Sequence, residues 1–217
     1  MLSFARREPS ATLLAAQLIA IPVYALTEDS SAGRALFSVF GILILVLVLL
    51  AVRSSPVPIW AVVLLGVPAT ALLMIQAITN SDDLLPWSSA LEAVIYFYAA
   101  GALLAYMLAD HEITRDELFA VGATFTLVAW GFAYVYVVCQ AVAPGSFTAA
   151  VDPAADRSWM ELLFLSFTTL SATGLGDVIP IRPFARGLVM LEQVAGLAYI
   201  AMVVSRVVGL TVFRRVT

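Results

Sequence analysis

The sequence is short of the residues that build enzyme and metal sites. Its 217 residues include one cysteine, Cys139, one histidine, His111, and no lysine, so that all eleven basic residues are arginine. One cysteine and one histidine cannot supply a zinc site or an intrachain disulfide. The G-x-S-x-G and H-E-x-x-H motifs of hydrolases are missing as well. We therefore expect that the chain is not an enzyme and carries no cofactor.

Charge is also scarce, and its distribution argues against nucleic acid as a partner. Only 12% of the residues are charged, and the formal net charge of -4 is thinly spread. Nucleic-acid binding needs a concentrated basic surface. In contrast, 62% of the residues are hydrophobic and the mean hydropathy is +1.00, whereas an ordinary soluble domain is roughly 45–50% apolar. The composition predicts a protein surrounded by membrane lipids.

Apolar runs of membrane-spanning length recur along the chain. A helix needs about 20 mostly apolar residues to cross the hydrocarbon core. Six segments meet this requirement: 10–26, 34–52, 57–79, 87–109, 117–143 and 184–212. The first follows two arginines, as the apolar run of a signal peptide does, but we interpret it as a retained helix. The sequence thus predicts an all-α, multi-pass membrane protein.

Arginines in the connecting loops predict the orientation of the chain. Positively charged loops favour the cytoplasmic side. Six crossings divide the arginines into two groups, and the group expected in the cytoplasm is the larger: Arg6, Arg7, Arg53, Arg115, Arg214 and Arg215, with Arg206 close by, against Arg34, Arg157, Arg182 and Arg186 outside. We expect both termini to be cytoplasmic.

One apolar segment, residues 159–170, is too short to cross the membrane. Ser158 and Glu161 stand three residues apart at its start, which is the spacing of a capping box. This pattern predicts a separate, re-entrant helix. It is followed by TTLSATGLGDVIP, residues 168–180, in which two glycines flank one leucine.

Glycines in this position predict an irregular backbone at membrane depth. Such a backbone is tolerated only where protein buries it or where it lines a water-filled cavity. Glycine adopts positive φ at little cost, and alternating such residues can turn successive carbonyl oxygens to one side. We therefore expect the carbonyls of this loop to face an aqueous path.

The loop resembles the selectivity filter of the bacterial six-transmembrane potassium channel family, commonly T-x-G-Y-G-D after a threonine-rich pore helix. The glycines align so that the five filter positions are Ala172, Thr173, Gly174, Leu175 and Gly176, with Asp177 next. In that family the stacked carbonyl oxygens replace the hydration shell of K⁺. The resemblance covers residues 117–212 as outer helix, pore helix, filter and inner helix. It implies a homotetramer in a bacterial inner membrane that conducts K⁺ passively.

Several positions depart from the family pattern. Leu175 replaces the filter tyrosine, whose hydroxyl braces the loop. Ala172 replaces a threonine whose hydroxyl helps to form the innermost cation site. Phe164 and Thr168 stand where some members hold the Trp and Glu that bond the aspartate. We expect a pore that prefers K⁺ but selects less strictly. Two alternatives remain open: a non-selective monovalent cation channel and a non-conducting regulatory homologue.

Further residues are expected to support the filter or to line the pore. The expected supports are Thr168, Thr169, Asp177 and Glu192. Because a charge inside a membrane is costly, Glu192 should lie behind the pore helix, where it either braces the filter by bonding to Thr168, Thr169 or the filter backbone or takes part in pH-dependent gating of the filter. Gly196 stands at the hinge position of the inner helix. Helical spacing from it predicts four apolar pore-lining residues, which either gate by dewetting or simply pack: Leu197, Ile200, Val204 and Val208.

The first four spans, within residues 1–109, occupy the position of a voltage sensor without its charges. Segment 87–109 contains no arginine or lysine, although each sensor charge contributes only about 2.3 kcal/mol per 100 mV. We therefore expect no ordinary voltage gating. Residues 110–116, with His111, are predicted to form a cytoplasmic linker that is either a solvated connector or a sensor of protons or cations. Residues 117–217 are predicted to form the pore domain.

Overall fold

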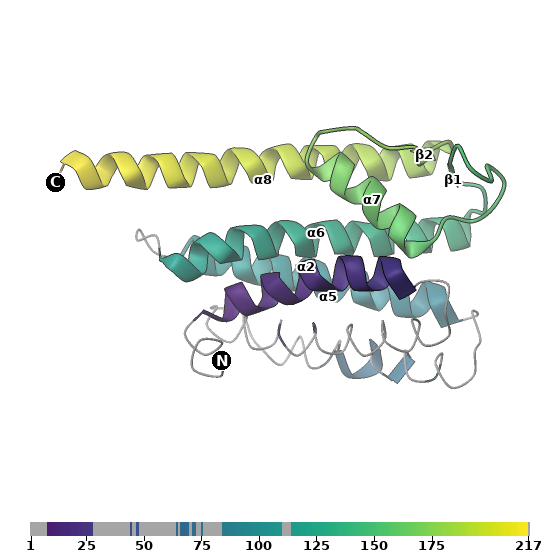
Figure 1. The fold of residues 1–217 in the computed structure, drawn as a ribbon, viewed down its shortest axis with the longest axis horizontal. Helices are drawn as coiled ribbons and strands as arrows, with labels where there is room; N and C mark the ends of the chain where they lie inside the picture. Colours follow the sequence, from purple (N-terminus) through teal and green to yellow (C-terminus); the bar gives the residue numbers. More distant parts are fainter. Residues whose placement is uncertain are drawn as a thin grey trace.

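The computed structural model consists mainly of long helices that lie side by side (Figure 1). It describes residues 8–27, 84–109 and 114–216, together with scattered residues between 44 and 75. The helices and strands in these ranges are α2 (Pro9–Thr27), α5 (Leu85–Met107), α6 (Arg115–Val142), β1 (Phe147–Thr148), α7 (Trp159–Leu170), β2 (Ile179–Pro180) and α8 (Pro183–Val216).

Four of the described helices are long and apolar enough to cross a membrane. They are Pro9–Thr27, Leu85–Met107, Arg115–Val142 and Pro183–Arg206. These helices coincide with four of the six predicted spans, and the protein is therefore a multi-pass membrane protein. The predicted spans 34–52 and 57–79 lie largely outside the described residues, and so does His111.

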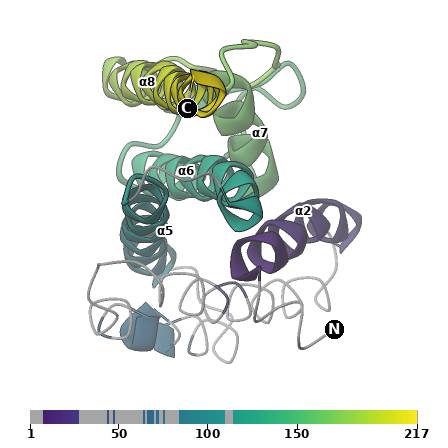
Figure 2. The same ribbon diagram turned by 90° about the vertical axis from the view of Figure 1, so that its left-hand side faces the viewer.

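Helix α6 stands at the centre of the described bundle, with α2 and α5 against it (Figure 2). The core between them is aromatic and aliphatic, and Tyr96, Leu127 and Trp130 are fully buried. The ring of Tyr96 lies 5.7 Å from that of Trp130 in an edge contact and stacks on Tyr134 at 5.5 Å. Aromatic pairs at these separations add to the stabilisation that burial gives.

The starts of α2 and α6 lie together at one end of the bundle. The Asp116 carboxylate accepts hydrogen bonds from the Ser10 backbone N–H at 3.0 Å and from the Ser10 hydroxyl at 2.8 Å. Asp116 therefore caps the first turn of α2, where backbone N–H groups lack partners within the helix. Helix α6 begins at Arg115, so the last two residues of the predicted linker 110–116 belong to its first turn.

Helix α7 begins at the predicted capping box, which the structure confirms. The Ser158 hydroxyl accepts from the Glu161 N–H at 3.3 Å, and the Glu161 carboxylate accepts from the Ser158 N–H at 2.7 Å. Glu161 also pairs with Arg157 at 3.0 Å. With 12 residues the helix is about 18 Å long, well short of the roughly 30 Å thickness of the hydrocarbon core.

Substituting Ser158 by alanine should destabilise the protein by about 1 kcal/mol, because the first turn of α7 loses its side-chain cap. Thermal unfolding of the purified protein in detergent should then occur about 2–4 °C lower. The matched control is Ser205→Ala, since Ser205 is an exposed serine inside α8. An equal shift in the two variants would show that the capping box does not stabilise α7.

Candidate functional site

The loop that follows α7 returns the chain to the end of the bundle from which α7 started. Strands β1 and β2 pair antiparallel, with Phe147 opposite Pro180 and Thr148 opposite Ile179. The Ile181 N–H adds a hydrogen bond to the Ser146 carbonyl at 2.9 Å. Segment 149–178, which contains α7 and the loop, is thus closed at its base, as the ribbon shows (Figure 1).

Two of the predicted filter residues, separated by one residue, have a left-handed backbone conformation. Ala172 has φ 58° and Gly174 has φ 63°, while Thr173 between them does not have a positive φ. We expected the two glycines to provide such positions, but Ala172 takes the place of Gly176. The reason is the end of α7: the residue after a helix cap commonly adopts the left-handed conformation, and the Ala172 N–H bonds back to the Thr169 carbonyl at 3.0 Å.

One carbonyl oxygen, that of Thr168, gathers the hydrogen bonds that hold the loop. It accepts from the Gly174 N–H at 3.0 Å, from the Thr173 hydroxyl at 3.2 Å and from the Ser171 hydroxyl at 3.4 Å. The hydroxyl of Thr168 itself donates to Leu165 within α7. Thr168 therefore contacts the loop through its backbone oxygen, and Thr173 ties the loop to the end of α7.

The other residues of the loop are exposed. Ala172 to Asp177 all present their side chains or backbone to the outside of this chain, and Leu175 is 76% exposed. Among the described residues, Asp177 has no hydrogen-bond or ion-pair partner. The surface formed by the loop is thus open to a neighbouring chain, water or ions.

Glu192 lies behind α7, but its partners differ from those we expected. Its side chain is fully buried on α8, is hydrogen-bonded to the Ser166 hydroxyl of α7, and accepts a hydrogen bond from the Tyr136 hydroxyl of α6. The predicted contacts with Thr168, Thr169 or the filter backbone are absent among the described residues. Glu192 meets α7 at Ser166, before the end of the helix, and Tyr136 was not singled out in the sequence because no local spacing relates it to the loop.

Gly196 is buried where α8 passes the end of α7. A Cβ atom at this position would overlap the Leu170 carbonyl oxygen and would lie 2.9 Å from its carbon. The neighbouring atoms belong to the backbone, so they cannot rotate away. The structure thus gives this glycine a role in close helix packing, in addition to the hinge position that the resemblance implies.

Two faces of α8 differ in burial. One face packs on α6 and α7 through Val189, Glu192, Gly196 and Tyr199, which are all buried. The predicted pore-lining residues are exposed, with Ile200 at the border of the buried face and the others farther round the helix: Leu197 58%, Ile200 39%, Val204 54% and Val208 55%. An apolar face thus remains free on the long helix that borders the loop.

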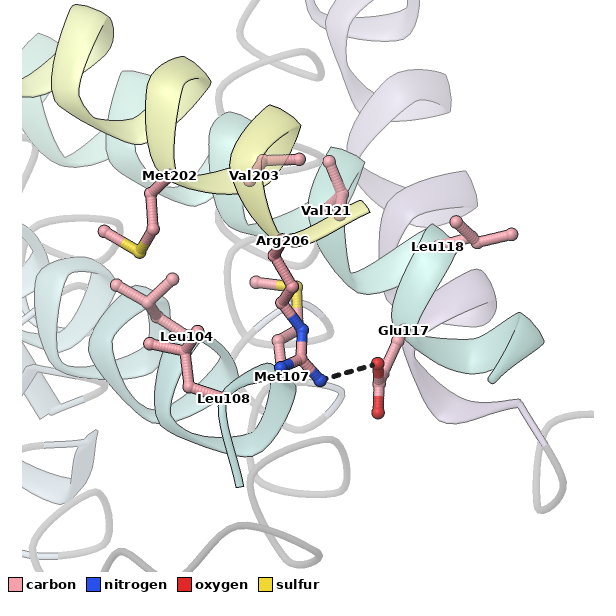
Figure 3. Close-up of a pocket in the computed structure, with 9 residues that line it drawn as sticks. All are labelled: Leu104, Met107, Leu108, Glu117, Leu118, Val121, Met202, Val203 and Arg206. Carbon is pink, nitrogen blue, oxygen red and sulfur yellow. Dashed lines mark hydrogen bonds and ion pairs between the residues drawn. The ribbon is translucent and has the colours of Figure 1, made fainter. Parts of the chain in front are cut away.

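A pocket lies at the opposite end of α8, between α5, α6 and α8 (Figure 3). Its lining is apolar apart from Glu117 and Arg206, whose carboxylate and guanidinium are 3.3 Å apart. About two turns earlier on α8, the Tyr199 hydroxyl donates to the Val121 carbonyl at 2.6 Å. These contacts join α8 to α6. The pair escaped the sequence reasoning because its members are 89 residues apart, although both stand at ends of spans expected on the same side.

Comparison with known proteins places this α6–α7–α8 unit in a family. A family model described as "Ion channel" matches residues 122–212. Protein LctB of Geobacillus stearothermophilus is 31% identical over 107 residues, which are 48% of this chain and 79% of that protein. Protein LctB of Bacillus caldotenax is 31% identical over 103 residues, or 46% and 76% of the two chains. No solved structure matches the chain. The chain therefore belongs to the ion channel family.

Proposed function

We propose that the chain is one subunit of a homotetrameric channel that conducts K⁺ passively through the loop 172–176. The observation that carries the proposal is the exposed loop after α7, in which positive φ angles alternate at Ala172 and Gly174. Such alternation turns carbonyl oxygens toward one side, and a ring of carbonyls can replace the water around a cation. The antiparallel closure of β1 on β2 supports a re-entrant course for this segment.

A tetramer is proposed because a single chain cannot enclose a pore. One loop supplies only one wall of a pore, and closed cyclic symmetry completes the ring with identical copies. The exposed apolar face of α8, with Leu197 and Val204, supports contact with other copies or with the pore. Helix α7 ends at the loop, so its partial negative charge favours a cation there.

Relaxed selectivity is part of the proposal. Ala172 offers no hydroxyl to the innermost cation site, and Leu175 has no hydroxyl that could brace the loop against the pore helix. The bond from the Thr173 hydroxyl to Thr168 supports a loop that keeps its carbonyl stack. A non-selective monovalent cation channel is the alternative if the loop widens, and a non-conducting regulatory homologue is the alternative if it cannot hold ions.

The proposed orientation places both termini in the cytoplasm of a bacterial cell, with the protein in the inner membrane. The starts of α2 and α6 and the Arg206–Glu117 pair lie at one end of the bundle. The start of α7 and the β1–β2 pair lie at the other end, with Arg157 and Arg186 (Figure 1). The cytoplasmic bias of arginine favours the first end as the inner one.

Residues 1–109 are proposed to form an N-terminal membrane domain that does not sense voltage. Within the described part of this region, α2 and α5 pack on α6 through a shared core, and α5 has no basic residue to move in the field. The stimulus that opens the pore would then reach it through packing on α6. Residues 110–116 are proposed as the link, and residues 117–217 as the pore domain.

Val204→Asp should hold the proposed pore open. Val204 lies on the exposed face of α8, where apolar side chains would dewet a narrow pore, and a carboxylate would keep it wet. We expect rubidium flux at rest to rise severalfold in proteoliposomes. Val142→Asp, at the exposed end of α6, is the control and should leave the flux unchanged. An unaltered open probability in the Val204 variant would argue against a hydrophobic gate at this level.

Rubidium uptake into liposomes that contain the purified chain tests the proposal as a whole. A potassium-loaded liposome with a conducting channel should accumulate external rubidium, and a protein-free liposome should not. Single-channel recording of the same preparation then gives the open-state current. Protein that assembles as a tetramer but carries no cation current would favour the non-conducting homologue.

A further inference from the structure

In the buried site that joins α6, α7 and α8, the Ser166 hydroxyl lies within hydrogen-bond distance of two acceptors on different helices. The Ser166 hydroxyl lies 2.8 Å from the Ala129 carbonyl oxygen and also contacts Oε1 of Glu192. A serine hydroxyl has one hydrogen, so it can serve only one of these acceptors. The Tyr136 hydroxyl, which also has one hydrogen, bonds Oε2 of Glu192.

No positive charge compensates a carboxylate at this place. Glu192, Ser166 and Tyr136 are each fully buried. The titratable groups that face the site are the Tyr136 phenol and the Cys139 thiol, both on α6. On α7 the acidic residue is Glu161, which is bound at the helix start to Ser158 and Arg157. Among the described residues no arginine pairs with Glu192, and an unpaired buried charge is strongly destabilising.

We propose that Glu192 carries a proton and that this neutral carboxyl group positions the pore helix. The proton on Oε1 is donated to the Ser166 oxygen, and Ser166 donates in turn to the Ala129 carbonyl. Tyr136 donates to Oε2. Every hydrogen then has an acceptor, and one continuous chain of hydrogen bonds links α8, α7 and α6.

The inference rests on the proposed function for its effect on ions. Glu192 does not touch the filter loop, so it is a positioning residue that acts through α7. Loss of the proton leaves a buried charge, and the single hydrogen of the Ser166 hydroxyl can then serve Glu192 or the Ala129 carbonyl but not both. Helix α7, which carries the loop at its end, then loses part of its attachment to α8. Cation selectivity should therefore fall as the pH rises. At acidic pH, where Glu192 keeps its proton, the selectivity should stay constant.

Infrared spectroscopy tests the proton directly and needs no conduction. The C=O stretching band of a protonated carboxylic acid should be present in the full-length protein at neutral pH and should decrease in Glu192→Gln. Glu92→Gln is the matched control, because Glu92 is a second buried carboxyl group in a membrane span, and the Glu192 variant must lose intensity that the Glu92 variant keeps. A carboxylate band lost in Glu192→Gln, in place of the acid band, would overturn the proposal.

Thermal unfolding and flux then test the positioning role. Glutamine can donate to Ser166 and accept from Tyr136, so Glu192→Gln should unfold at the same temperature at neutral and alkaline pH. The unsubstituted protein should lose about 5–10 °C on the alkaline side, together with part of its preference for rubidium over sodium. Equal pH dependence in both proteins would contradict the role of Glu192. An acid band without cation flux in any variant would refute the proposed function and leave the protonated carboxyl standing.

Discussion

Gly196→Ala should lower the thermal stability of the protein more than any other single-methyl change considered for α8. The added Cβ overlaps the carbonyl oxygen of Leu170 and lies 2.9 Å from its carbon. Leu170 is the last residue of α7, so relief requires α7 or α8 to shift as a whole. Overpacking of this kind costs about 1–3 kcal/mol, and sometimes more. We expect unfolding in detergent about 3–10 °C below that of the unsubstituted protein.

Gly187→Ala is the matched control on the same helix. A Cβ atom at Gly187 meets no atom within 4 Å, and alanine favours a helix over glycine by about 1 kcal/mol. This variant should be as stable as the parent or slightly more stable. Equal unfolding temperatures for Gly196→Ala and Gly187→Ala would contradict the close approach of α8 to the end of α7. Because α7 carries the loop at its end, its displacement should also reduce rubidium flux in Gly196→Ala but not in Gly187→Ala.

Gly174→Ala should abolish most of the cation flux while changing stability little. Gly174 has φ 63° and open space around its Cα, so the added methyl group strains the backbone without a clash. A left-handed conformation costs a non-glycine residue about 1–2 kcal/mol. The loop can relieve this strain by turning one carbonyl away, and a fourfold ring would lose four carbonyls at one level. Because a factor of ten corresponds to about 1.4 kcal/mol, we expect a loss of flux of tenfold or more.

Gly145→Ala separates the effect on the pore from the effect of strain. Gly145 also has a positive φ, 72°, and nothing lies within 4 Å of the position of its Cβ. It lies in the connection between α6 and β1, away from the filter loop in sequence. The two variants should show similar small shifts in unfolding temperature, and only the Gly174 variant should lose rubidium flux. Equal rubidium flux in the two variants would show that the loop is not part of the conduction path.

Sequence reasoning succeeded where the determining interactions are local. The capping box of Ser158 and Glu161 spans three residues, and the pattern alone located the start of α7. Long apolar runs likewise located four helices within a few residues of their observed ends. The resemblance to a filter also depends on a short, continuous string.

Non-local partners could not be predicted in this way. Asp116 caps α2 through Ser10, which is 106 residues away, and no spacing in either segment indicates this contact. Tyr136 and Glu192 are 56 residues apart, so no local spacing indicates the hydrogen bond that joins α6 to α8 behind α7. The positive φ at Ala172 was missed because glycine was expected to supply it, whereas the end of α7 imposes it.

The reversal potential under bi-ionic conditions tests the central claim, that backbone carbonyls around Gly174 and Gly176 form a path for cations with a preference for K⁺. The purified chain would be reconstituted in a planar bilayer with potassium chloride on one side and sodium chloride on the other. The account predicts a reversal potential displaced toward the potassium equilibrium potential, by less than an ideally selective pore would give. A permeability order with chloride above potassium would contradict it.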